Sequence, residues 1–255
     1  CEKPFAGSLE EIDRVLDAAE KSGCRVALGH HHRFSKINEE ARRLIEAGEI
    51  GTPTICYRYS NGGLLNNGSH QVDTVRFILG DPRPVWALGQ VVRTTDRHER
   101  HDPIEDLCGG IIALEGGVRI VLESDLPEPD LPEWGNSIHG TEGTIQIHRR
   151  EGLRLLSSKS GTSKEIPLEP GDVGALQAAE LIDCLEGRVT DHRNNAANNR
   201  TTIEALLGLY ESVRTQNLTV FPLPSEASPL HQMIENHTLE VTEPGKYDIR
   251  IDRKK

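Results

Sequence analysis

The chain has 255 residues and a formal net charge of −11, so it offers no basic surface for nucleic acid or an anionic membrane. Hydrophobic residues make up 36% and charged residues 27%, a balance that predicts a globular protein with an ample core. The sequence has no apolar run of transmembrane length and no secretory leader at its start, and we expect a cytoplasmic protein. Its 5 cysteines are scattered, which predicts reduced thiols rather than disulfides or a zinc site.

The first third of the sequence predicts alternating helices and strands. Ser8 and Glu11 have the spacing of a capping box, in which the Ser8 hydroxyl accepts a hydrogen bond from the backbone of Glu11. Gly23 suits the left-handed residue that ends such a helix. The expected elements are a helix from Ser8 to Gly23, a strand at 24–28, a helix over 37–48, a strand at 54–59, a loop at 60–68 and a helix over 69–80.

From residue 85 the pattern changes to short strands separated by glycine-rich turns. So many consecutive strands predict a largely antiparallel sheet. The expected fold class is therefore α+β, preceded by the last helix and strand of a Rossmann-type α/β domain. The expected strands are 85–92, 107–114, 118–124, 136–139, 144–148, 153–157 and 165–168, followed by helices at 173–185 and 196–215 and an edge strand at 247–251.

His70 is the first candidate for proton transfer. If Gly68 or Ser69 caps the helix, His70 lies in its first turn, where unsatisfied N–H groups disfavour a charged imidazolium. A general base requires a neutral imidazole near pH 7, and Asp73 is close enough along the helix to orient the ring. The alternative is that His70 only caps the helix through a ring nitrogen.

Lys3 is the second candidate. Pro4 favours an extended conformation for Lys3, where its ammonium could donate to a substrate hydroxyl and favour deprotonation. The alternative is an ordinary solvated lysine.

The remaining histidines give no specific metal signal. Neighbouring side chains among His30, His31 and His32 would point to opposite faces of an extended chain, and His98 and His101 have no third ligand at a specific offset. We expect solvated loops at both places and no metal. The sequence also lacks GxGxxG, a Walker loop and GxSxG, so it has no phosphate-cradling loop or hydrolase elbow of its own.

Several separated stretches together resemble the C-terminal portion of one family, the glucose-fructose oxidoreductase, inositol dehydrogenase and rhizopine-catabolism (Gfo/Idh/MocA) family of NAD(P)-dependent oxidoreductases. The stretches are Glu2-Lys3-Pro4, Arg33-Phe34, the helix ending at 45–51, the glycine-rich segment 62–73, the turn at 138–144 and Phe221-Pro222-Leu223. The resemblance implies that residues 1–29 are the end of a dinucleotide-binding Rossmann domain. It also implies that residues 30–255 form a substrate-binding and oligomerisation domain with an open, mostly antiparallel sheet covered by helices on one face.

The resemblance implies hydride transfer between a secondary alcohol of a sugar, cyclitol or polyol and NAD or NADP. His70 would be the general base, Lys3 would polarise the oxygen, and Asn66 would orient the substrate. We further expect Asp73, Arg33 and His32 to bind substrate, and Glu2, Lys3 and Pro4 to contact the cofactor. The parent enzyme would be a homo-oligomer joined through its sheet face, while this chain alone should be inactive and bind NAD(P) weakly.

Asn66 is a departure from the family pattern. Members of the family often have an aspartate four residues before the histidine, and an amide supplies no negative charge. Two alternative functions therefore stay open: a non-catalytic substrate-binding or oligomerisation domain, and NAD-dependent elimination or glycoside cleavage through transient oxidation.

Overall fold

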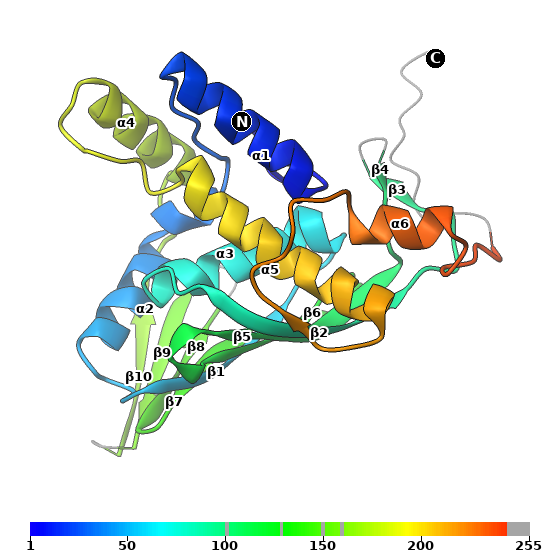
Figure 1. The fold of residues 1–255 in the computed structure, drawn as a ribbon. Helices are drawn as coiled ribbons and strands as arrows, with labels where there is room; N and C mark the ends of the chain where they lie inside the picture. Colours follow the sequence, from blue (N-terminus) through cyan, green and yellow to red (C-terminus); the bar gives the residue numbers. More distant parts are fainter. Residues whose placement is uncertain (100–101, 128–129, 149–150, 159–160, 244–255) are drawn as a thin grey trace, which may run out of the picture.

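The computed structural model describes residues 1–99, 102–127, 130–148, 151–158 and 161–243. His101 and the edge strand expected at 247–251 lie outside these ranges. The predicted α+β class is confirmed, because helices pack on one side of a single large sheet (Figure 1). In the described part of the chain, no helix combines the length and apolar character needed to cross a lipid bilayer.

The large sheet has nine strands in the order β10-β9-β8-β7-β1-β6-β5-β2-β11. Every neighbouring pair is antiparallel except β1 and β6, which run parallel, so the predicted largely antiparallel sheet is confirmed. The strands are β1 (Pro53–Tyr59), β2 (Pro84–Val92), β5 (Leu107–Leu114), β6 (Arg119–Glu123), β7 (Asn136–Gly140), β8 (Gly143–Ile147), β9 (Gly152–Ser157), β10 (Thr162–Pro167) and β11 (Thr219–Val220). A separate short pair joins β3 (His98–Glu99) to β4 (Asp102–Pro103).

The first helix, α1 (Leu9–Ser22), begins as its sequence predicts. The Ser8 side chain accepts from the Glu11 N–H, the Glu11 carboxylate accepts from the Gly7 N–H, and Gly23 adopts the left-handed conformation with a φ of 66°. The strand expected at 24–28 is wrong. Only Ala27 forms an isolated bridge, to the loop residue Asn195, because no strand of the described chain lies beside this segment.

The other helices are α2 (Lys36–Glu46), α3 (Ser69–Ile78), α4 (Val173–Leu185), α5 (Ala196–Thr215) and α6 (Pro229–Glu235). Of these, α2, α3 and α5 lie against the inner face of the sheet, whereas α4 packs on the turn at 31–34 and α6 packs on α5. α5 approaches the sheet very closely, since a Cβ added at Gly89 of β2 would lie 2.6 Å from the Leu209 carbonyl oxygen. Glycine on the strand therefore allows the buried helix to seat directly on the backbone.

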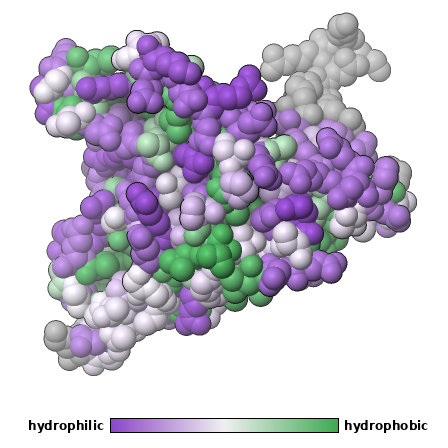
Figure 2. Space-filling view, viewed as in Figure 1, coloured by the Kyte–Doolittle hydropathy of each residue, from purple (hydrophilic) through white to green (hydrophobic). Residues whose placement is uncertain are grey.

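Two surfaces of the described chain expose apolar side chains. On the outer face of the sheet, Leu88 is 48% exposed and Val220 is 65% exposed. On α4, Ile182 is 51% and Leu185 74% exposed, and Figure 2 shows hydrophobic residues on this helix at the upper left.

Candidate active site

A cavity of about 480 Å³ opens where β1, α3 and the 3₁₀ turn η1 (His31–Phe34) meet. Its volume falls in the range of pockets that hold small molecules. The cavity is lined mainly by histidines, amides, hydroxyls and one arginine; its lining residues include His31, His32, Asn38, Arg58, Ser60, Asn61, Asn67, His70, Gln71, Thr74, Asn136 and His148.

His70 reaches this cavity from the first turn of α3. The helix begins at Ser69 with Gly68 at its N-cap position, as predicted, and no side chain caps it, so His70 does not act as a cap. The loop expected at 60–68 is wrong in its second half, because Leu64–Gly68 form one π-helical turn, η2, that runs straight into α3. Within this turn the N–H groups of Asn66 and Asn67 donate to the Gly63 carbonyl.

His70 is nevertheless held neutral. It is 6% exposed, and burial, followed by the nearby His32, His30 and Lys3, lowers the pKa of its imidazole far below the ordinary value. Its Nδ1 is buried without a hydrogen-bond partner among the described residues. At pH 7 the ring is therefore neutral, with one unprotonated nitrogen that can accept a hydrogen bond from a hydroxyl group.

His30, which precedes η1, and His31 and His32, which begin it, gather around His70. The solvated loop expected at these three residues is therefore wrong. The ring of His32 stacks on that of His70 at 4.3 Å between centroids, and the centroids of His31 and His30 lie 5.0 and 5.3 Å from it. Burial, and then the neighbouring His31, lowers the pKa of His32 to about 4. The 3₁₀ turn directs these side chains inward, a geometry that an extended chain could not give.

Lys3 lies against the segment that precedes His70. Its Nζ donates to the Asn66 side-chain oxygen at 2.5 Å, to the Asn66 carbonyl at 3.1 Å and to the Asn67 side-chain oxygen at 3.2 Å. Lys3 and Asn66, predicted from distant parts of the sequence, are therefore brought together. Asn67 continues this contact into the cavity.

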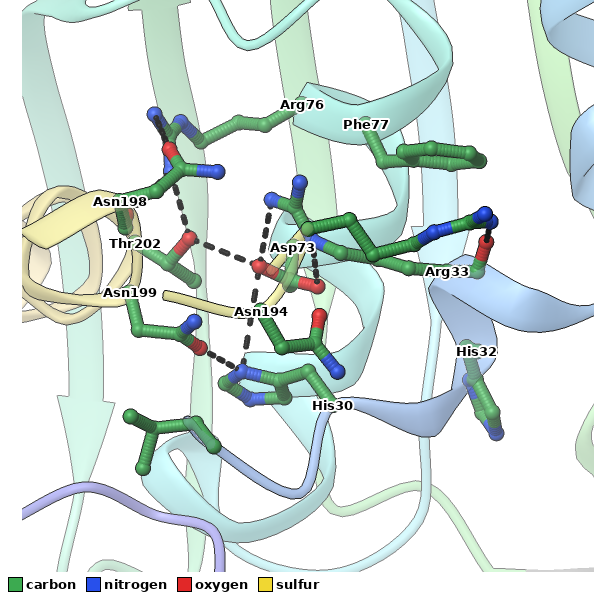
Figure 3. Close-up of polar contacts among 12 residues, drawn as sticks. His30, His32, Arg33, Asp73, Arg76, Phe77, Asn194, Asn198, Asn199 and Thr202 are labelled. Atoms are coloured by element: carbon green, nitrogen blue, oxygen red, sulfur yellow. Dashed lines mark hydrogen bonds and ion pairs between the residues drawn. The ribbon is translucent and has the colours of Figure 1, made fainter. Parts of the chain in front are cut away.

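Arg33 and Asp73 lie behind the cavity wall, where they form ion pairs. Arg33 donates twice to Asp73, at 2.8 Å each, and twice to Asp81, at 3.0 and 2.7 Å; Thr202 adds a bond to Asp73 at 3.1 Å (Figure 3). Both Arg33 and Asp73 are 1% exposed, and neither lines the cavity. The expected substrate contacts of Arg33 and Asp73 are thus replaced by a buried ion-pair network behind the cavity wall.

The expected pairing of Asp73 with His70 is also not formed. Among the described residues, the histidine nearest to Asp73 is His30, whose Nδ1 lies 3.8 Å from the carboxylate and also bonds the Asn199 side chain (Figure 3). Asp73 therefore organises the ring behind His70 rather than His70 itself.

Several cavity residues were missed at the level of sequence, above all Arg58, Ser60 and Thr74. Arg58 carried a signal: period-two alternation in β1 places it on the same face as the buried Cys56, so it had to point inward. Ser60 and Thr74 carried none, because isolated hydroxyls are common at strand ends and on helices.

Within the described ranges, no three histidine, cysteine or acidic side chains converge as a set of metal ligands. His98, in β3, accepts from or donates to nothing in the cavity; its Nδ1 lies 3.1 Å from the Asp96 carbonyl oxygen.

A second cavity, of about 650 Å³, adjoins the first, because His31 and Val173 line both. Its other lining residues include Cys1, Glu2, Ala27 and Gly29. The N-terminal segment thus contributes Glu2 to one cavity and Lys3 to the border of the other.

Comparison with known proteins supports the resemblance seen in the sequence. A family model described as the GFO/IDH/MocA C-terminal domain matches residues 56–146. The chain is 26% identical over 212 residues to 1,5-anhydro-D-fructose reductase of Ensifer adhaerens, covering 73% of this chain and 62% of the reductase. It is 27% identical over 184 residues to scyllo-inositol 2-dehydrogenase (NAD(+)) of Bacillus subtilis (strain 168), covering 65% of this chain and 53% of the dehydrogenase. The chain thus spans between half and two thirds of the length of these relatives.

A solved structure shares the fold. An oxidoreductase from Agrobacterium radiobacter, determined in complex with NAD+, L-tartaric acid and magnesium, superposes with a TM-score of 0.71 at 17% identity, covering 86% of this chain and 72% of that one. The fold and these matches define an α+β domain of the kind that oxidoreductases carry. Residues 56–146 thus resemble the GFO/IDH/MocA C-terminal domain, and the longer matches are to a reductase and a dehydrogenase.

Proposed function

We propose that this chain is the substrate-binding part of an NAD(P)-dependent oxidoreductase that moves hydride between a nicotinamide and a secondary alcohol of a sugar, cyclitol or polyol. The observation that carries the proposal is His70, a neutral imidazole in the cavity whose Nδ1 has no hydrogen-bond partner among the described residues. The names of the relatives, a sugar-derivative reductase and an inositol dehydrogenase, support this substrate class.

In this scheme His70 takes the hydroxyl proton as the carbon loses hydride. Lys3 places a positive charge beside the forming alkoxide, and that charge favours oxygen deprotonation in a site with little water. Asn66 holds the ammonium of Lys3 in place through its side-chain oxygen and its carbonyl. In the reverse direction, protonated His70 returns the proton to the oxygen.

The chain's own residues fit one end of the cofactor. We place the nicotinamide near the cavity lined by Glu2 and Gly29, with Lys3 and Pro4 alongside, because this cavity meets the substrate cavity at His31. Nicotinamide, when bound there, supplies the hydride acceptor. Since the sequence has no phosphate-cradling glycine loop, the rest of the dinucleotide would be held by a Rossmann domain, of which residues 1–29 would be the closing segment.

The parent enzyme would assemble through the outer face of the sheet. The exposed Leu88 and Val220 make this face suited to contact with a second copy.

The decisive experiment compares His70→Asn with the unchanged enzyme, carried together with its dinucleotide-binding domain. Asparagine keeps a polar side chain of similar reach but cannot take a proton, so kcat should fall by about 10²- to 10⁴-fold while KM changes little. Undiminished turnover would show that His70 is not the base and would favour a non-catalytic binding domain. Mass analysis of the product separates oxidation from elimination, because only elimination releases water or an aglycone.

Calorimetry on the 255-residue chain tests whether the dinucleotide is bound mainly by another domain. We expect weak binding of NADH, since the pyrophosphate finds no cradle here. Tight binding by this chain would contradict the assignment of cofactor binding to another domain.

A further inference from the structure

Arg58 is a fully buried arginine on the inner face of β1. It is 2% exposed and lines the cavity that holds His70. Its strand neighbours on that face, Cys56 and Leu122, are buried and apolar. On the strand face, the guanidinium therefore has neighbours that cannot replace the water it loses on burial.

Within the described part of the chain, Nε and Nη2 of Arg58 have no hydrogen-bond partner, and no carboxylate forms an ion pair with it. Burial accordingly lowers the pKa of Arg58 to about 10, with only the Cys56 thiol acting in the opposite direction. A buried, unpaired charge is costly, and native proteins keep one where a ligand supplies the counter-charge.

The rest of the cavity lining has the same character. The Ser60 and Thr74 hydroxyls and the His70 Nδ1 are also buried without partners in the described structure. Among the described residues that line the cavity there is no aspartate or glutamate, although the chain as a whole has 40 acidic residues against 29 basic ones. The described lining therefore carries one positive charge and no negative charge inside an acidic protein.

A purely structural role for Arg58 is less consistent with these contacts. Buried structural arginines satisfy their five N–H groups with carbonyls or carboxylates, as Arg33 and Arg76 do here. At Arg58, in contrast, hydrogen bonds are missing at two of its three nitrogens.

We propose that the substrate carries an anionic group, a carboxylate or a phosphate, that pairs with the Arg58 guanidinium. The substrate is then a sugar acid or a sugar phosphate rather than a neutral sugar or cyclitol. This inference rests on the proposed function for the reacting alcohol, while the anion site itself depends only on Arg58 and its cavity. A planar guanidinium binds either group through two parallel hydrogen bonds.

The test is a binding measurement that requires no turnover. Calorimetry on the whole chain compares D-glucuronate, D-galacturonate and D-gluconate with their neutral counterparts D-glucose, D-galactose and D-glucitol, and adds D-glucose 6-phosphate. We expect at least one anion to bind about 10- to 100-fold tighter than its neutral counterpart, and Arg58→Met to abolish that preference. Preference for carboxylates or for the phosphate identifies which anion the site takes.

Arg43→Met is the matched control. It removes the same charge from the surface, where Arg43 pairs with Glu40 outside the cavity. The preference for the anion should survive in this variant. Equal binding of acids and neutral sugars, or a preference that persists in Arg58→Met, would overturn the proposal.

The outcomes for the two proposals are separable. If Arg58-dependent anion binding is found but the complete protein turns over no alcohol, the anion site stands and the oxidoreductase assignment fails. If a neutral polyol is oxidised at a rate that Arg58→Met leaves unchanged, the oxidoreductase assignment stands and the anion site fails.

Discussion

Arg33 and Arg58 are buried to almost the same extent, at 1% and 2% exposed, yet their surroundings are opposite. Arg33 has two carboxylates, Asp73 and Asp81, and four hydrogen bonds to them. Arg58 has no carboxylate partner in the described structure and two nitrogens without hydrogen bonds. The first arrangement holds the fold together behind the cavity wall, whereas the second leaves binding capacity inside the cavity. Burial alone therefore does not distinguish a structural charge from a functional one; the partners do.

The largest expected change in stability follows from removing Arg33 from its ion pairs with Asp73 and Asp81. Arg33→Met leaves Asp73 buried without its main counter-charge, so the free energy of unfolding should fall by about 3–5 kcal/mol. Urea unfolding followed by circular dichroism measures this loss. A loss under about 1 kcal/mol would mean that the network contributes little to stability.

As the pH is lowered, the free energy of unfolding should fall first because of His32 in the cavity, and only at lower pH because of Asp73 in the ion pair. His32, whose pKa is lowered to about 4, stays neutral when folded but takes up a proton when unfolded below pH 6.5, so stability falls as the pH drops from 6.5 toward 4. Burial tends to raise the pKa of Asp73, but the charges of His30 and Arg33 hold it below the ordinary value, so its contribution is lost only below about pH 4.

Urea unfolding at pH 7.5, 6.0 and 5.0 measures how the free energy of unfolding falls over the range in which His32 should act. Each histidine held neutral gives a slope of up to about 1.4 kcal/mol per pH unit. His32→Asn should flatten the slope, and an unchanged slope in that variant would show that another group causes the acid sensitivity.

Arg58→Met should have a smaller effect and the opposite sign. Because methionine fills similar space without a buried charge, the ligand-free chain should become more stable, by on the order of 1 kcal/mol. Thermal unfolding without sugar present checks this expectation. A large destabilisation would assign Arg58 to the fold rather than to the substrate.

The smallest effect is expected at the surface. Arg43, which is 61% exposed, pairs with Glu40 three residues earlier on α2, and pairs of this kind contribute little. Arg43→Met should leave the free energy of unfolding unchanged within the error of the same urea experiment. A larger change would remove it as the matched control for Arg58.

Local patterns in the sequence predicted the fold well. Alternation and turn residues located most strands of the sheet, and Ser8, Glu11 and Gly23 marked both ends of α1 because capping depends only on neighbours in the chain. The segment 24–28 failed because strand formation needs a partner, which local sequence does not supply.

The site was predicted less completely, for a physical reason. His70, Lys3 and Asn66 were singled out, and Lys3 and Asn66 are in contact, but the hydrogen bonding of Asp73 depends on Arg33 and Thr202, which meet it only through tertiary packing. The first argument for a neutral His70 used the predicted start of α3, which the structure confirms, but local sequence did not show the π-helical turn that runs into that start. Burial and neighbouring charges produce the same neutral ring by another route.

The position of β1 in the sheet determines when, during folding, the wall of the cavity around Arg58 can form. β1 lies between β6 and β7, and both partners follow it far along the chain, with Ile55 opposite Arg119 on one side and His139 on the other. Contacts between such distant segments form late, because the entropy of closing the long intervening loop must be overcome first. During synthesis, β1 therefore stays unpaired until β6 has emerged, and it gains its second partner only with β7, when both strand neighbours of Arg58 are present.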